Sequence, residues 1–165
     1  MHAFQSRIDP RTEDYAARRS AMLGLVDRLH DLGRRAADLS EKRRPRFEER
    51  GQLTPRERLA RLLDPGLPFL ELYGLAGYRV DDPEPDTSVP GATSIAGIGF
   101  VAGARCMIVV DDSGINAGAA TAMTLEKVAG CLDKALAMKL TFVHLVESAG
   151  ANLLQYEVGV WARGG

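Results

Sequence analysis

The segment TSIAGIGFVAGARCMIVVDDSG, residues 93–114, decides the fold of this chain. Two apolar runs flank Ala102-Gly103-Ala104, and glycine favours the backbone angles that a tight hairpin turn requires. We therefore predict two antiparallel strands joined at this turn. Residues 107–110 form a continuous apolar run. Such a run is typical of a strand that is fully buried.

The chain after this hairpin predicts alternating helices and strands. A loop of small residues, INAGAA (115–120), precedes a helix over residues 121–138, and a strand follows over 141–146. The expected inner face of the helix consists of Met123, Val128, Leu132, Ala135 and Leu136. A further helix is expected to begin within 152–158. The order strand, strand, helix, strand, helix favours an α/β layered architecture with a right-handed parallel crossover. Because an apolar strand is then left at the sheet edge, the sequence looks cut short.

The chain before the hairpin is mainly helical. Residues 14–39 read as one long amphipathic helix, and Pro45 is expected to interrupt any helix in the basic stretch EKRRPRFEERG (41–51). Thr54, with Pro55 and Glu57, predicts a capping box that starts the next helix. FLELYGLAGY (69–78) suggests a short strand. The acidic, proline-rich segment at 79–91 suggests either an irregular surface loop or a segment that is ordered only by a partner.

Composition is that of a folded domain, with 45% hydrophobic and 26% charged residues in a chain of 165. Residues 1–65 hold 15 Lys and Arg against 11 Asp and Glu, so this half is basic. A basic face can meet phosphates, although such faces are more often simply solvated. Cys106 and Cys131 are expected to be reduced structural thiols. The N-terminus lacks the apolar segment of a secretory signal. A cytoplasmic protein with no membrane and no nucleic-acid partner is expected.

The turn Ser148-Ala149-Gly150-Ala151 is built from small residues directly after the strand at 141–146. We expect its amide groups to be unpaired and open to a ligand, which suits an oxyanion that develops during a reaction. A second small loop, with Gly114, Ala117, Gly118 and Ala119, also follows a buried strand. Two such loops would line one crevice at the strands' carboxyl ends. The alternative is a tight strand-to-helix connection with no ligand.

Other polar residues are interpreted structurally. His144 is expected to be a hydrogen-bonded core histidine. Glu147 is expected to brace the loop or to interact with the N-terminus of the following helix, rather than act as a base. Asp111 and Asp112 are expected to cap their loop. Solvated charges are the favoured interpretation of Lys127 and Lys134, with phosphate binding as the alternative. The three histidines of the sequence do not assemble a metal cluster, so we expect no metal in this chain.

Several segments together resemble one family. GQLTPRERLARLLDPGLPFLEL, GLAGY, VPGATSIAGIGFVAGARCMIVVDD, INAGAATAMTLEKV and HLVESAGANL follow one another in the order seen in the carboxyltransferase (β) subunit of biotin-dependent acyl-CoA carboxylases. The resemblance runs from about residue 44 to residue 154. It implies an α/β, crotonase-like (ClpP/crotonase) fold, here truncated and preceded by a long N-terminal helix. It also implies transfer of a carboxyl group from carboxybiotin to an acyl-CoA through an enolate held by backbone amides.

The resemblance implies roles for particular residues. Ala149 and Gly150 would donate to the enolate oxygen, with Ala151 adjacent. Gly118 and Ala119 would line the acyl-CoA crevice, together with the remaining small residues of both loops, Gly114, Ala117 and Ser148. Asn152 in SAGAN is closer to the methylcrotonoyl-CoA and geranyl-CoA branch than to the propionyl-CoA branch. INAGAA and Glu147 depart from the methylcrotonoyl pattern.

The family pattern also sets expectations for domains and partners. Residues 1–52 are expected to form a helical extension, and residues 53–165 part of the N-terminal carboxyltransferase domain. The biotin-binding part of the family is not in this sequence, so the chain is expected to be inactive alone. The expected partners are an acyl-CoA substrate, a biotin carboxylase/biotin carrier (α) subunit that bears the biotin, and further β subunits. Two alternatives are a non-catalytic scaffold or decoy, and a free-standing acyl-CoA-binding module.

Overall fold

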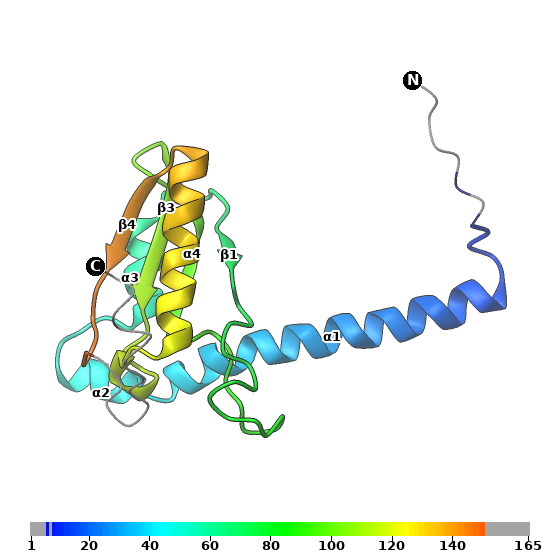
Figure 1. The fold of residues 1–165 in the computed structure, drawn as a ribbon, viewed down its shortest axis with the longest axis horizontal. Coiled ribbons are helices and arrows are strands. Elements are labelled where there is room, and N and C mark those ends of the chain that lie inside the picture. The colour runs from blue at the N-terminus through cyan, green and yellow to red at the C-terminus, as the bar shows by residue number, and fades with distance from the viewer. Residues whose placement is uncertain (1–5, 7, 151–165) are drawn as a thin grey trace.

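The computed structural model describes residue 6 and residues 8–150 (Figure 1). The helix expected at 152–158 lies outside these residues. From the hairpin onward the order strand, strand, helix, strand is the predicted one, and the arrangement is α/β. Their bounds are α1 Glu13–Glu41, α2 Arg44–Glu49, α3 Pro55–Leu62, β1 Leu70–Leu72, β2 Ser94–Val101, β3 Ala104–Asp111, the 3-10 helix η1 Asn116–Gly118, α4 Ala122–Met138 and β4 Thr141–Leu145.

The predicted hairpin is confirmed and forms the centre of a four-stranded sheet with the order β1-β2-β3-β4. β2 and β3 pair antiparallel, with Val101 opposite Ala104. Ala102 and Gly103 between them have φ angles of 50° and 78°. Positive φ angles at both residues are typical of two-residue hairpin turns, whose backbone twist matches that of the two strands. β3 and β4 pair parallel, so α4 is the predicted crossover and β4 lies at an edge of the described sheet.

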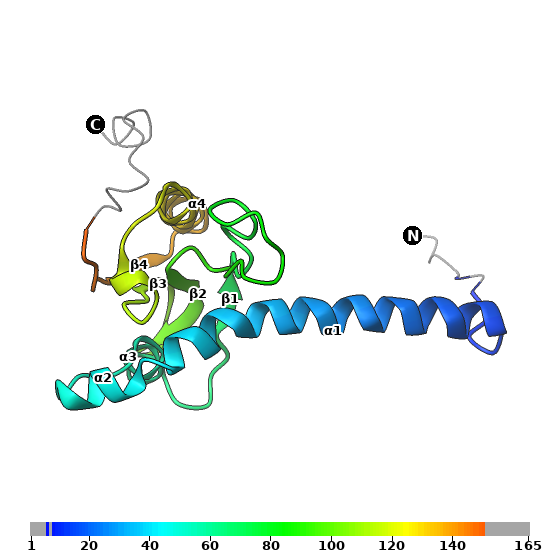
Figure 2. The ribbon, with the colours of Figure 1, turned by 90° about the horizontal axis from the view of Figure 1, so that it is seen from below.

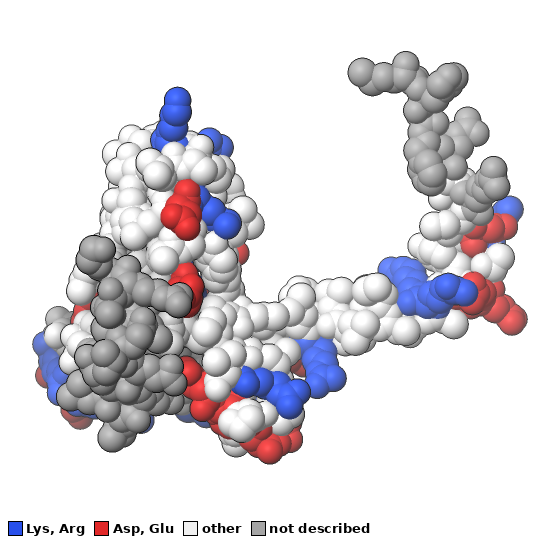
Figure 3. Space-filling view, viewed as in Figure 1, with Lys and Arg blue, Asp and Glu red and all other residues white. Residues whose placement is uncertain are grey.

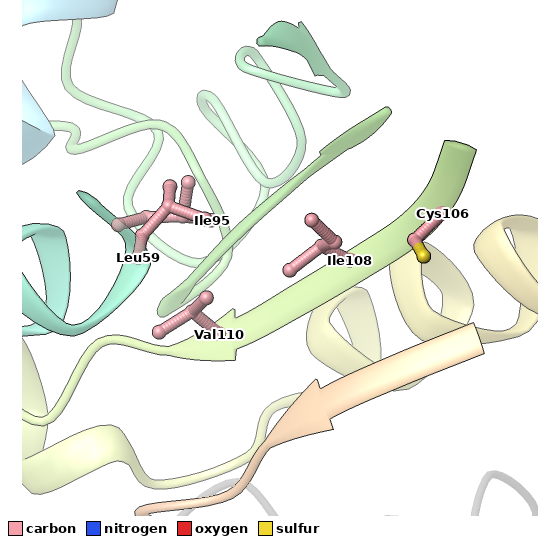
Figure 4. Close-up of a cluster of buried hydrophobic side chains, with 5 residues drawn as sticks. All are labelled: Leu59, Ile95, Cys106, Ile108 and Val110. Carbon is pink, nitrogen blue, oxygen red and sulfur yellow. The ribbon is translucent and has the colours of Figure 1, made fainter. Parts of the chain in front are cut away.

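Both faces of the sheet are covered, which explains the continuous apolar run in β3. All four residues of Met107–Val110 are 0% exposed, so this prediction is confirmed. Ile108 and Val110 pack with Leu59 of α3 on one face (Figure 4). Met107 and Val109 pack with residues of α4 on the other face, and Figure 2 shows α3 and α4 on opposite sides of the sheet.

The predicted inner face of α4 is partly wrong. Leu132 is 47% and Leu136 is 82% exposed, whereas the buried residues of the helix are Thr124, Lys127, Cys131 and Ala135. The first turn of α4 determines which side of the helix faces the sheet. There Thr121 and Thr124 form a capping box, and Thr124 donates to the Ala92 carbonyl at 3.0 Å. Because apolar residues occur on several sides of this helix, their periodicity did not define the buried face.

The predicted long helix is confirmed as α1, and Figure 1 shows that it extends well away from the sheet. Met22 and Leu29, two apolar residues at helical spacing in this amphipathic segment, are 59% and 48% exposed. Its last turn meets the body, where Ser40 donates to the Asp112 carboxylate at 2.6 Å. The helical path breaks at residues 42–43, between α1 and α2, in the stretch where Pro45 was expected to interrupt a helix. Pro45 itself lies in the first turn of α2, where proline needs no amide hydrogen.

Three further predictions for the chain before the hairpin are confirmed. Thr54 and Glu57 form the capping box of α3, with Pro55 in the first turn. β1 is the expected short strand, and residues 79–91 contain no helix or strand. The helices of the described residues include none that is both long enough and apolar enough to span a membrane.

Candidate functional site

The two small-residue loops lie in direct contact at the carboxyl ends of β3 and β4. Ala149 donates its amide to the Ala117 carbonyl at 3.0 Å, and Ala120 donates to the Gly150 carbonyl at 2.8 Å. The Ser148 hydroxyl donates to the Gly118 carbonyl at 2.6 Å. These three hydrogen bonds join the loops into one rim, as the sequence predicts for loops that follow neighbouring strands.

Gly118 makes this close approach possible. Its φ angle is 69°, and it follows two other residues with positive φ, Asn116 and Ala117, at 48° and 54°. A Cβ atom at this position would overlap the Glu147 carbonyl oxygen and would lie 3.4 Å from the Ser113 Cα. Glycine is therefore required both by the backbone conformation and by the lack of space.

The joined loops border a cleft of about 320 Å³. Its wall on the loop side is formed by Ser113, Gly114, Asn116, Ala117, Glu147, Ser148 and Ala149. Four of the predicted site residues, Gly114, Ala117, Ser148 and Ala149, are therefore among its lining residues. Gly118 is buried and does not line it, and neither do the half-buried Ala119 and the exposed Gly150. Ala151 lies outside the described residues.

The expectation of unpaired amides is wrong for Ala149 and Gly150. The Ala149 amide pairs with a backbone carbonyl, and the Gly150 amide donates to the Ser148 hydroxyl at 3.0 Å. Both residues are nevertheless exposed, and a Cβ at Gly150 would meet no atom within 4 Å. The physical reason for the pairing is that the second loop lies close enough to satisfy donors that we had assigned to a ligand.

A polar network holds the start of the turn. Asp111 accepts a hydrogen bond from His144 Nε2 at 2.9 Å and from the Glu147 amide at 3.0 Å. Glu147 in turn accepts from the Ser113 hydroxyl at 2.9 Å and pairs with Arg58 at 2.9 Å. Glu147 therefore braces the loop, as expected. His144 is hydrogen-bonded as expected, but its side chain is 28% exposed rather than in the core.

The electrostatics of Asp111 follow from these contacts. Burial alone would raise the pKa of this carboxyl group. The hydrogen bonds from His144 and the Glu147 amide, with the charges of His144 and Arg58, outweigh burial and hold the pKa below its usual value. Asp111 is therefore a carboxylate at neutral pH that ties β3 to the beginning of the turn.

Asp111→Asn is expected to lower the free energy of unfolding at pH 7 by about 1–2 kcal/mol, because charge-assisted hydrogen bonds are lost. Because the pKa of Asp111 is lowered in the folded protein, the stability that this carboxylate contributes depends on pH. It is present above the unfolded-state pKa of an aspartate and is lost as the pH falls through the folded-state pKa. Urea unfolding of both proteins at pH 7 and at acid pH checks this. A stability gap that stays the same size at acid pH would contradict it.

Asp112 caps its loop, as predicted, whereas the Asp111 carboxylate instead holds the turn that follows β4. The Asp112 carboxylate accepts from the Gly114 amide at 3.1 Å and from Ser40 of α1. Burial raises the pKa of this carboxyl group despite these two hydrogen bonds. Gly114 is needed here because a Cβ would overlap the Ser40 side chain. The end of α1 is thus fixed to the loop that borders the cleft.

Lys127 is not a solvated charge, and it does not line the cleft. It is 3% exposed, and its ammonium group donates to the carbonyls of Gly91 and Ser94 at 3.0 and 2.6 Å. Burial lowers its pKa to about 8. Lys134 is exposed, with its ammonium group 5.2 Å from the centre of the Tyr73 ring. Both lysines therefore have structural partners, and the phosphate role that we weighed for them is not supported.

The opposite wall of the cleft was missed as a functional surface by the sequence reasoning. It consists of Arg43, Arg46, Phe47, Arg50 and Gln52 from α2 and its ends. The basic composition of this stretch was visible in the sequence. Its position beside the two loops was not, because it depends on how α2 packs. Among the described residues, no group of three or more His, Cys, Asp or Glu side chains is placed to hold a metal ion.

The family described as the carboxyl transferase domain matches residues 46–165. The chain belongs to this family. A probable biotin-dependent acyl-coenzyme A carboxylase beta2 subunit of Mycobacterium tuberculosis is 37% identical over 90% of the chain. The biotin-dependent 3-methylcrotonyl-coenzyme A carboxylase beta1 subunit of the same organism is 44% identical over 69% of the chain.

The same similarity is found among solved structures. The beta subunit of P. aeruginosa geranyl-CoA carboxylase superposes on 99% of this carboxyl transferase chain with a TM-score of 0.89 and 43% identity. The resemblance and the fold class inferred from the sequence are thereby confirmed. The chain spans 27% and 21% of the two mycobacterial proteins and 30% of the geranyl-CoA carboxylase subunit. The boundary placed at residue 52 stays a prediction.

Proposed function

We propose that this carboxyl transferase chain supplies the acyl-CoA-binding part of an acyl-CoA carboxylase acting on a methylcrotonoyl-CoA-like substrate. The observation that carries the proposal is the rim formed by the two hydrogen-bonded loops at the edge of the cleft. The relatives named for 3-methylcrotonyl-CoA and geranyl-CoA support a branched, unsaturated acyl group. An α subunit that bears biotin and further β subunits are the proposed partners.

The two candidate amides differ in how readily they can serve a substrate. The Ala149 amide is held by the Ala117 carbonyl, and losing that bond would separate the loops. The Gly150 amide is held by the Ser148 hydroxyl, which also has the Gly118 carbonyl as a partner. A thioester oxygen can replace this hydroxyl on Gly150 without opening the rim. We therefore assign the oxyanion-donor role to the Gly150 amide, a role worth about 2.7–4 kcal/mol in comparable sites.

The α subunit is the proposed carrier of biotin, and we place no biotin site among the described residues of this chain. When bound to its carrier, biotin supplies the activated carboxyl group, and we derive no step through it on this chain. What this chain does is hold the thioester and stabilise negative charge on its oxygen.

The test is amide NMR of the labelled chain with two ligands. Addition of 3-methylcrotonyl-CoA is expected to shift the Gly150 amide resonance, because its hydrogen bond passes from Ser148 to the thioester oxygen. A CoA thioether of the same chain length lacks that oxygen and is expected to bind with no such shift. If the thioester binds but gives the same Gly150 amide chemical shift as the thioether, the assignment is wrong. A chain that binds neither ligand would favour a non-catalytic scaffold.

A further inference from the structure

The three consecutive residues just before β2 have positive φ angles. Gly91, Ala92 and Thr93 have φ values of 106°, 48° and 49°. Glycine adopts such angles freely, whereas alanine and the β-branched threonine do so only under strain. Residues held in this way persist only where their surroundings fix them, and they gather at functional sites. Other parts of the molecule must therefore hold this segment in place.

Buried donors of α4 hold the strained segment. Lys127 donates to the Gly91 and Ser94 carbonyls at 3.0 and 2.6 Å, and Thr124 donates to the Ala92 carbonyl at 3.0 Å. Charged side chains of both signs lie over the outer side of α4 in Figure 3, whereas Thr124 and Lys127 are 5% and 3% exposed. Because the three carbonyls are fixed from one helix, the segment cannot relax without leaving buried polar groups unpaired.

The strained conformation directs the Thr93 side chain at the loop that carries Ala119. Thr93 is 7% exposed, and its hydroxyl donates to the Ala119 carbonyl at 3.1 Å and lies 3.0 Å from the Thr124 hydroxyl. The Ala119 carbonyl and the Ala120 amide belong to one trans peptide unit, so they point in opposite directions. The Ala120 amide donates to the Gly150 carbonyl at 2.8 Å. One peptide plane therefore joins the Thr93 hydroxyl to Gly150.

We propose that Thr93 is a positioning residue for the thioester site. Its hydroxyl fixes the orientation of the Ala119–Ala120 peptide plane, and this plane fixes where Gly150 lies. The inference rests on the proposed function, which assigns the oxyanion-donor role to the Gly150 amide. A donor of this kind stabilises developing charge best when it is already in place and does not have to reorganise during the reaction. Gly150 is exposed, so hydrogen bonds along the rim rather than side-chain packing must fix it.

The experiment compares Thr93→Val with matched variants. Thr93→Val keeps the β-branched shape and removes only the hydroxyl, whereas Thr93→Ser retains the hydroxyl and serves as the rescue variant. Ser94→Ala is the control, because it removes a neighbouring buried hydroxyl that donates to the Ala92 carbonyl at 3.2 Å rather than to the rim. If Thr93→Val does not fold, Thr93→Ala takes its place, since Ala92 shows that alanine can adopt a φ angle near 48° in this segment.

Two measurements are made on each protein. Hydrogen exchange of the Ala120 amide, taken relative to that of Val109 in the middle of the sheet, is expected to be about 3- to 10-fold faster in Thr93→Val, because one buried hydrogen bond is lost. The Val109 reference removes any change in global stability. Amide NMR gives the difference in Gly150 chemical shift between 3-methylcrotonyl-CoA and its thioether analogue. This difference is expected to decrease in Thr93→Val, and Thr93→Ser and Ser94→Ala are expected to match the wild type in both measurements.

The positioning role of Thr93 is overturned if Thr93→Val leaves either measurement at its wild-type value, and the proposed function then still stands. The same holds if Ser94→Ala changes both measurements as much as Thr93→Val does, or if Thr93→Ser fails to restore them, because the hydroxyl contact with the rim would then not be the cause. A wild type that shows no thioester-specific shift at Gly150 would overturn the proposed function, and this inference with it.

Discussion

Gly118→Ala is expected to separate the two loops and to lower the free energy of unfolding by about 2–4 kcal/mol. Two costs add at this position. The φ angle of 69° strains any residue with a Cβ, and the Cβ would overlap the Glu147 carbonyl oxygen. Both are backbone constraints, so no side-chain rearrangement relieves them. The hydrogen bonds from Ala149 to Ala117 and from Ala120 to Gly150 are expected to lengthen or break.

Gly103→Ala is the matched control for this variant. Gly103 has a φ angle of 78°, and a Cβ there would meet no atom within 4 Å. It therefore carries the backbone strain without the overlap. Urea unfolding gives the two stabilities, and hydrogen exchange of the Ala120 and Ala149 amides reports whether the loops remain joined. Equal stabilities, with exchange at both amides as slow as in the wild type, would show that the loops do not depend on the glycine.

Local sequence signals predicted the parts of the fold that local geometry determines. The hairpin at Ala102-Gly103 and the capping box at Thr54 are formed by a few consecutive residues, so their patterns are sufficient. The buried run at 107–110 required covering on both faces, and α3 and α4 provide it. The rotation of α4 could not be predicted in this way. It depends on contacts of Thr124 and Lys127 with residues that lie about 30 positions away in the chain.

The candidate site shows the same division. Small residues after two strands predicted that the loops would meet at one edge, and this was right. The sequence did not reveal that the loops satisfy each other's amides, because the partner of the Ala149 amide is 32 positions distant. The arginine wall was visible as basic composition alone. The packing of Phe47 decides whether these arginines face solvent or a cleft. A count of charged residues carries no information about that packing.

Lys127→Met is expected to have a lower free energy of unfolding than the wild type, and this stability gap between the two proteins is expected to widen as the pH rises. The Lys127 pKa is lowered by burial from 10.5 to about 8 in the folded protein. Between these two values the unfolded chain binds more protons than the folded chain, so the wild type gains stability with increasing pH. A neutral amine still donates to the Gly91 and Ser94 carbonyls and no longer bears a buried charge. The gap between the two proteins should grow by about 2–3 kcal/mol from pH 7.5 to pH 10.

Lys134→Met separates this effect from the general response of the protein to alkaline pH. Lys134 lies on the same helix but is exposed, and its contact with Tyr73 raises its pKa rather than lowering it. Removing it should leave a stability gap that does not widen between pH 7.5 and pH 10. Urea unfolding of the three proteins at both pH values measures the gaps directly. If the Lys127→Met gap stays constant or narrows as the pH rises, the buried ammonium group is not destabilised in the folded state. The two carbonyls of Gly91 and Ser94 would then compensate fully for its loss of hydration.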